Sequence, residues 1–159
     1  MKPLKTDVLA IKKRLRRIRN DGFELENQML RLEWAENNLI GVGSPMLSDM
    51  PKNPSPSNDR LANAMSKKLE IEAEINAISG GYLKERKELG DIIRKLEHPD
   101  QRAVLRMRYF DRNEWEDIVR MLYSRRKDYV DNIDKYYKAV FKLHGNALAE
   151  LAMLIKNFD

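Results

Sequence analysis

The chain has 159 residues, of which 42% are hydrophobic and 35% are charged, and its formal net charge is +5. It contains no cysteine, which excludes disulfide bonds and thiolate metal sites. No segment reaches the roughly 18 consecutive apolar residues of a membrane span, so we expect a soluble, cytoplasmic protein without membrane contact.

The first part of the sequence predicts a helical hairpin. Apolar residues recur at helical spacing from Thr6 to about Leu39, and a second such pattern runs from near Ser57 or Asn58 towards Glu97. Two amphipathic helices joined by one loop pack most simply side by side and antiparallel. We therefore predict an all-α protein with a coiled-coil-like arm over residues 1–97 and a second domain over residues 98–159.

Three segments interrupt the helical patterns of the arm. Residues 41–58 hold four prolines, which a helix cannot run through, and they predict a loop. Asn20-Asp21-Gly22 is a point where the first helix is expected to bend or break. Gly80-Gly81 is expected to interrupt the second helix, because each glycine costs about 1 kcal/mol relative to alanine, and Gly90 to weaken it again.

A run of basic residues lies early in the first helix, at Lys12, Lys13, Arg14, Arg16, Arg17 and Arg19. It fits either a phosphate-binding surface or the solvated side of a helix whose apolar stripe is Ile11, Leu15 and Ile18. We favour the solvated side, because charges must point outward from such a stripe in any case.

The last third of the chain predicts two short helices. One covers Arg102 to Phe110, and a turn at Asp111-Arg112-Asn113 follows, with Asn113 as the N-cap of the next helix. In that helix the residues with i, i+3, i+4 and i+7 spacing form one buried face: Trp115, Ile118, Val119 and Leu122.

The final helix has two candidate starts, one after Ser124 and one after Asp134. From Lys135 onward an apolar row is clear, consisting of Tyr136, Val140, Leu143, Ala147, Leu151 and Leu154. Basic and amide side chains occupy the opposite side, as expected of a helix that enters the DNA major groove. The candidate DNA-binding residues are Arg125, Arg126, Lys127, Lys135, Lys138, Lys142 and Asn146.

These same residues resemble a known DNA-binding module. The order of QRAVLRMRYF, EWEDIVRMLYS and a closing helix ending in ALAEL is similar to region 4 of the sigma-70 family. LRMRYF, WEDIV, MLYSRR and FKLHGNAL are similar to the ArpU-type late transcription regulators of phages of Gram-positive bacteria. The upstream SPSNDRLANAMSKKLEIEAEI also resembles that family. The resemblance implies a sigma-like factor or activator with a helix-turn-helix, acting in the bacterial host cytoplasm.

The chain departs from that family's pattern between residues 127 and 139. In many such proteins the serine-arginine turn runs almost directly into the segment that matches VFKLHG. Here a stretch containing Asp128, Asp131 and Asp134 intervenes, and it leaves the start of the recognition helix open.

Our leading hypothesis is a sequence-specific phage transcription regulator that binds double-stranded DNA. Its arm would form a homodimer, contact RNA polymerase, or place two reading heads at a fixed spacing. Two alternatives are a small-terminase-like DNA-packaging subunit and a helical adaptor that binds no DNA. We expect no enzyme activity, no cofactor and no catalytic or metal-binding residues, because phosphate loops, nucleophile pairs and metal clusters are missing from the sequence. His144 is expected to be a histidine at the edge of the core with a local hydrogen bond.

Overall fold

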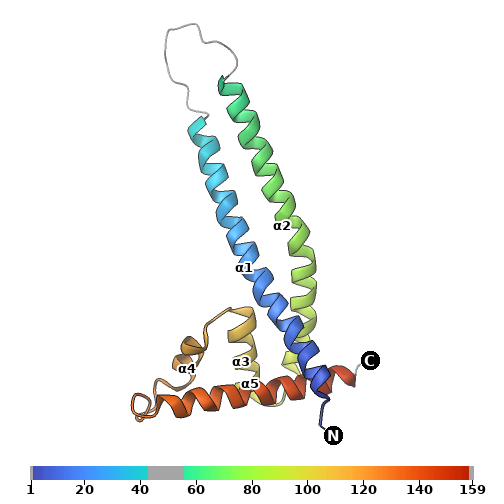
Figure 1. Ribbon diagram of the computed structural model, residues 1–159, viewed down its shortest axis with the longest axis vertical. Coiled ribbons are helices and arrows are strands. Elements are labelled where there is room, and N and C mark those ends of the chain that lie inside the picture. The colour runs from blue at the N-terminus through green and yellow to red at the C-terminus, as the bar shows by residue number, and fades with distance from the viewer. Residues whose placement is uncertain (1, 43–55, 158–159) are drawn as a thin grey trace. The chain divides into compact units, whose positions relative to one another are not determined.

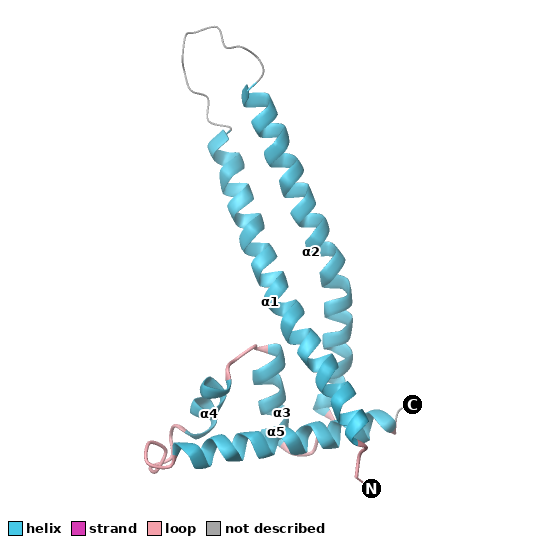
Figure 2. Ribbon diagram, viewed as in Figure 1, coloured by secondary structure: helices cyan, strands magenta, loops and turns pink. Residues whose placement is uncertain are grey.

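The computed structural model describes residues 2–42 and 56–157, and every regular element over these residues is a helix (Figure 1, Figure 2). The elements are α1 (Lys5–Val42), α2 (Pro56–Arg94), α3 (Pro99–Leu105), the π-helical turn η1 (Arg106–Phe110), α4 (Trp115–Tyr123) and α5 (Ile133–Lys156). This confirms the all-α class and the long N-terminal helix pair. Within the described ranges, no helix combines the length and the apolar composition needed to cross a membrane.

The helices form two compact units. The first holds the described residues up to Gly22 and from Tyr82 onward, and the second holds the described residues from Phe23 to Gly81. The chain passes from one unit to the other after Gly22 and again after Gly81, whereas the predicted domain boundary lies between residues 97 and 98. The reason is that the end of the helix pair nearest α3 belongs to the same unit as the C-terminal helices.

In the second unit, α1 and α2 run antiparallel. Arg31 pairs with Glu74 at 3.0 Å and Lys68 with Glu36 at 3.8 Å, so rising numbers in one helix meet falling numbers in the other. Leu25, Ala35 and Ile71 are buried. The unit also leaves large apolar side chains exposed, namely Met29, Leu30, Trp34, Leu61, Met65 and Leu69.

The first unit holds the larger core. The predicted stripe on α1 is confirmed, since Ile11, Leu15 and Ile18 are at most 4% exposed. α2 adds Leu89 and Ile93, both fully buried. α5 packs against both α3 and α4, and their shared cluster consists of Val104, Ile118, Val119, Tyr136 and Val140.

The interruption predicted at Gly80-Gly81 is wrong, and the first helix does not break at Asn20-Asp21-Gly22. α1 continues through Gly22, and α2 continues through Gly80, Gly81 and Gly90. At Gly22 the missing Cβ makes room for a neighbour, because a methyl there would lie 2.7 Å from Arg112 Nη1. Packing along the rest of each helix therefore outweighs the local cost of these glycines.

The predicted loop over residues 41–58 lies mostly outside the described residues. At its two borders the helices extend further than expected, because α1 ends at Val42 and α2 begins at Pro56. Proline suits the first position of a helix, where its missing N–H would have no helical partner.

The short helices also differ from prediction in their details. The helix expected over Arg102 to Phe110 begins at Pro99 and changes to π geometry at Arg106. There the Asp111 N–H donates to the Arg106 carbonyl, five residues back, over 2.9 Å. The N-cap of α4 is Glu114 rather than Asn113, because the left-handed Arg112 (φ 61°) extends the turn by one residue.

We expect the double substitution Gly80→Ala and Gly81→Ala to stabilise the protein by about 1–2 kcal/mol. Both glycines are exposed within α2, and an added Cβ at either meets no atom within 4 Å. Urea denaturation followed by circular dichroism measures the change. Gly22→Ala is the contrasting variant and should gain less, because its methyl meets Arg112. Equal or lower stability of the double variant would show that α2 is not continuous at this point.

Candidate nucleic-acid interface

The start of α5 decides between the two alternatives left by the sequence. Residues 124–132 form successive turns, with Arg126 N–H donating to Tyr123 O and Asn132 N–H to Asp128 O. α5 begins at Ile133, so the start after Ser124 is wrong. The N-cap is Asn132, and Asp134 lies in the first turn, where the positive end of the helix favours an acid.

Asp128 organises this long turn. It accepts hydrogen bonds from the Tyr136 hydroxyl and from Asn132 Nδ2, and Lys135 Nζ lies 3.8 Å from it. The hydrogen bond from Tyr136 holds the pKa of Asp128 below its usual range, with the Asn132 amide and Lys135 adding to the effect. The negative charge of Asp128 is therefore compensated by residues of the same inserted segment, 127–139.

The predicted basic residues fall into two groups. Arg125, Arg126 and Lys127, which we call the basic turn, are exposed at the N-terminal end of α5. Lys135, Lys138 and Lys142, which we call the lysine row, follow along one side of α5 and are also exposed. Asn146 is exposed one turn beyond the row.

These cations differ in whether they already interact with an acidic or aromatic side chain of the protein. Lys135 is drawn towards Asp128 and lies 5.5 Å above the Tyr136 ring. Among the described residues, no ion pair engages the basic turn, Lys138 or Lys142. Lys138 and Lys142 are thus the cations of α5 with the least internal competition.

The side of α5 away from the lysine row is built into the core, as predicted. Tyr136, Val140, Ala147 and Leu151 are buried, whereas Leu143 and Leu154 are half-buried. Tyr136 stacks on Tyr123 of α4 with ring centroids 4.8 Å apart. Figure 1 shows α5 passing both α3 and α4, so the core fixes which side of α5 remains accessible.

The basic run on α1 is not simply a solvated face. Lys13 and Arg17 are exposed, but Arg14 pairs with Glu85 at 2.5 Å. Arg19 donates to the Arg108 carbonyl over 3.1 Å and pairs with Glu114. The interpretation as a purely solvated face is therefore wrong for part of the run, because α2, η1 and the N-cap of α4 supply partners that helical spacing alone does not reveal.

His144 is buried, as expected, but its hydrogen bond is not local. Its Nε2 lies 2.8 Å from the hydroxyl of Tyr109 in η1, and its ring meets Trp115 edge to face at 4.9 Å. Burial, together with the nearby positive charges of Lys12 and Arg108, lowers the pKa of His144 to about 4. No group of residues in the described ranges is arranged to hold a metal ion.

The comparisons with known proteins give one match. Residues 65–140 match a family described as a protein of unknown function (DUF1492), over slightly less than half of the chain. That stretch runs from within α2 to the early part of α5, so it includes the basic turn, Lys135 and Lys138 but stops before Lys142 and Asn146. No curated protein and no solved structure matches the chain.

The protonation of His144 predicts a specific loss of stability in mild acid. Its folded pKa of about 4 lies below the usual 6.5, so between these values the unfolded chain binds the proton and the folded chain does not. Stability should fall as the pH drops below 6.5, by about 2 kcal/mol from this residue at pH 5, and the loss should level off below pH 4.

Urea denaturation at pH 7 and pH 5 tests this, with His144→Gln showing a smaller loss than the wild type. The matched control is His98→Gln, because His98 is the only other histidine and is exposed. An identical pH dependence in wild type and His144→Gln would contradict the assignment.

Proposed function

We propose that this protein is a sequence-specific DNA-binding regulator of phage transcription. In this proposal α3 with η1, α4 and α5 act as a helix-turn-helix of the sigma-70 region 4 kind, and α5 is the recognition helix. The observation that carries it is the two-sided character of α5. One side holds Tyr136 and Val140 in the core, and the other presents Lys138 and Lys142, which form no ion pair with any described residue.

The chemistry of the exposed side suits a DNA groove. The major groove admits an α-helix, where lysine contacts phosphates or guanine and asparagine contacts adenine. Lys138, Lys142 and Asn146 are presented in this way along α5. We expect the basic turn to contact the phosphate backbone, because guanidinium groups form strong hydrogen bonds with phosphate.

Lys135 has a smaller role in this proposal than its place in the row indicates. Its ammonium group lies near Asp128, whose pKa is held low, so the carboxylate stays charged and competes with any phosphate. Binding through Lys135 would first have to release it from this partner.

The second unit supports a role for the arm in assembly. Met29, Leu30, Trp34 and Leu69 are each 59–63% exposed, which is a large apolar surface for one hairpin. We propose that this surface joins two copies of the chain, so that two α5 helices address one DNA site. RNA polymerase is a further partner that the arm would contact in a sigma-like regulator.

A genomic pull-down separates this function from its alternatives. Sheared source DNA is recovered on the protein, washed at about 150 mM salt and sequenced, because phosphate contacts alone weaken steeply with salt. Enrichment upstream of late or structural genes supports the regulator, and enrichment beside terminase genes supports the packaging subunit. No recovery even at about 50 mM salt would contradict DNA binding and favour the adaptor.

Lys138→Glu combined with Lys142→Glu should weaken binding to the recovered site by at least about 100-fold, because two contacts are replaced by two repulsions. Gel-shift titration measures the affinity, and circular dichroism checks the fold. The matched control is Lys2→Glu with Lys5→Glu, which changes the net charge equally at exposed positions. Wild-type affinity in the Lys138→Glu, Lys142→Glu variant would show that the lysine row does not contact DNA.

Replacing Arg125, Arg126 and Lys127 by alanine should reduce the salt dependence of binding more than its sequence preference. Each lost phosphate contact lowers the slope of log K against log salt by about 0.9, so three contacts lower it by about 2.7. Titration of the recovered site and of a scrambled site at several salt concentrations gives both slopes. An unchanged slope would show that the basic turn does not touch phosphate.

A further inference from the structure

A cavity of about 360 Å³ lies in the first unit, on a flank of α5 that borders the lysine row. Its walls come from α1, η1, α4 and α5, so residues that are far apart in the sequence meet there. Phe141 lines its edge, one helical turn beyond Lys138. This volume falls within the range of about 300–1,000 Å³ that is usual for small-molecule sites.

Positive charge dominates the wall that α1 and η1 provide. Lys12, Arg16, Arg19 and Arg108 line the cavity. Arg19 and Arg108 share the carboxylate of Glu114, at 2.7 and 3.3 Å. Among the described residues, Lys12 and Arg16 form no ion pair, so the cavity keeps cations that lack an internal counter-charge.

Aromatic rings form the other wall. Trp115 lies edge to face with Phe141 at 5.2 Å and with His144 at 4.9 Å, and the Arg108 guanidinium lies 4.6 Å above the Trp115 ring. Buried Tyr109 and His144 contribute the hydrogen-bonded pair that lines the interior. Burial raises the pKa of Tyr109 and lowers that of His144, so both rings are uncharged near neutral pH.

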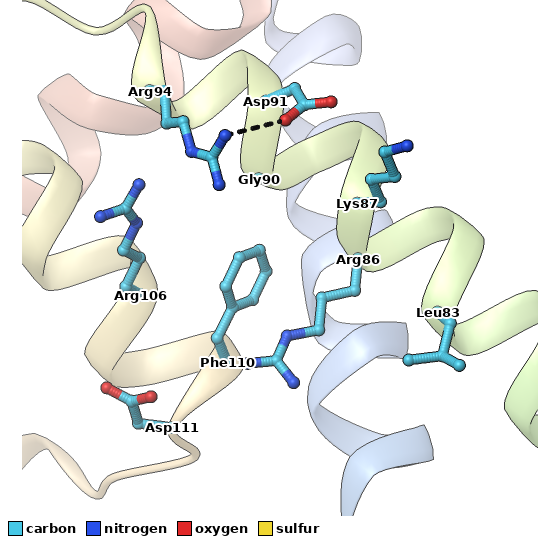
Figure 3. A pocket seen from close by; sticks show the side chains of 9 residues that line it. All are labelled: Leu83, Arg86, Lys87, Gly90, Asp91, Arg94, Arg106, Phe110 and Asp111. Atoms are coloured by element: carbon cyan, nitrogen blue, oxygen red, sulfur yellow. Dashed lines mark hydrogen bonds and ion pairs between the residues drawn. The ribbon is translucent and has the colours of Figure 1, made fainter.

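A larger cavity of this unit lacks that combination. It measures about 600 Å³ and lies between α2 and η1, where Figure 3 shows Phe110 as its one aromatic ring. Asp91 there is paired with Arg94 at 3.4 Å, and the Arg86 guanidinium lies 5.1 Å from the Phe110 ring. Arg86 and Arg94 thus have partners within the wall, whereas Lys87 and Arg106 form no ion pair among the described residues. The lining includes two acids, Asp91 and Asp111, and the smaller cavity is lined by none of the described carboxylates.

The short segment η1 contributes side chains to both cavities. It directs Arg106 and Phe110 to the cavity in Figure 3, and Arg108 and Tyr109 to the smaller one.

We propose that the smaller cavity binds a nucleoside phosphate, with the phosphate at Lys12 and Arg16 and the base against Trp115 and Phe141. Unpaired cations supply the charge that a phosphate requires, and aromatic faces supply stacking for a base, which is tolerant of base identity. Asn20 and the Tyr109 hydroxyl are the polar groups placed to contact the edge of the base or the sugar.

This site is separate from the DNA-contacting residues of the proposed function. Neither the lysine row nor the basic turn lines the cavity. Binding of a free nucleotide is therefore measured without DNA, and its failure or success leaves the DNA-binding proposal to its own tests.

Tryptophan fluorescence reports on the site directly. The chain has two tryptophans, and Trp34→Phe leaves Trp115 as the only one. We titrate this full-length variant with AMP, GMP, CMP and UMP, and in parallel with adenosine and with inorganic phosphate. We expect saturable quenching by at least one nucleotide, with an affinity at least about tenfold above those of adenosine and phosphate, because only the nucleotide engages both walls.

A pair of matched double variants assigns the phosphate contact. In the Trp34→Phe background, Lys12→Ala with Arg16→Ala should weaken nucleotide binding by at least about tenfold. Lys13→Ala with Arg17→Ala removes the same charge from exposed positions of α1 outside the cavity and should leave binding unchanged.

Three results would overturn the proposal. The first is no saturable quenching by any nucleotide up to about 5 mM. The second is quenching by inorganic phosphate at the same concentration as by the nucleotides, which would show a site for charge alone. The third is an equal loss in both double variants. The comparison of ligands uses only the Trp34→Phe chain, so it decides the question even where the Lys12 and Arg16 variant fails to fold.

Discussion

Burial of the first apolar stripe of α1 is the constraint on which the rest of the structure depends. Ile11, Leu15 and Ile18 bring the start of α1 into the same compact unit as the C-terminal helices. Once they are buried, Arg19 reaches the carbonyl of Arg108 and the carboxylate of Glu114. Each of those contacts is modest by itself, because Glu114 is largely exposed, so the apolar burial must supply most of the stabilisation.

α5 combines three environments on one helix. Its core side fixes the orientation of α5, and its opposite side keeps the lysine row accessible. Phe141 and His144, on a flank between these sides, line the cavity of about 360 Å³. Tyr136 and Lys135, in the first turns of α5, are the partners of Asp128 in the preceding turn. An acid in a basic region is thereby compatible with an interface for phosphate.

The sequence correctly predicted the features that repeat with helical spacing. It did not predict the features that depend on contacts between residues far apart in the chain. The stripe on α1 and the apolar row of α5 follow from helical spacing, which tertiary packing reinforces. The helix breaks expected at Gly22, Gly80 and Gly81 do not occur, because the low helix propensity of glycine is outweighed by packing along a long helix. The π-helical turn has no marker in RMRYF, and the partners of Arg14, Arg19 and His144 lie in other helices, so spacing within one element gives no sign of them. The basic turn and the lysine row were chosen by residue type, and their role in binding remains a proposal.

The ion pair between Lys156 and Asp7, at 2.6 Å, has a consequence for how the chain folds. It joins the two ends of the first unit, and contacts between positions so far apart in sequence form slowly because a long loop must close first. During synthesis the hairpin of α1 and α2 can pair early, whereas the pairing of Asp7 with Lys156 must wait for the end of α5 to emerge. In that interval the apolar side chains of α3 and α4 that pack on α5, Val104, Ile118 and Val119, are open to other chains, so aggregation during expression should trace to these short helices.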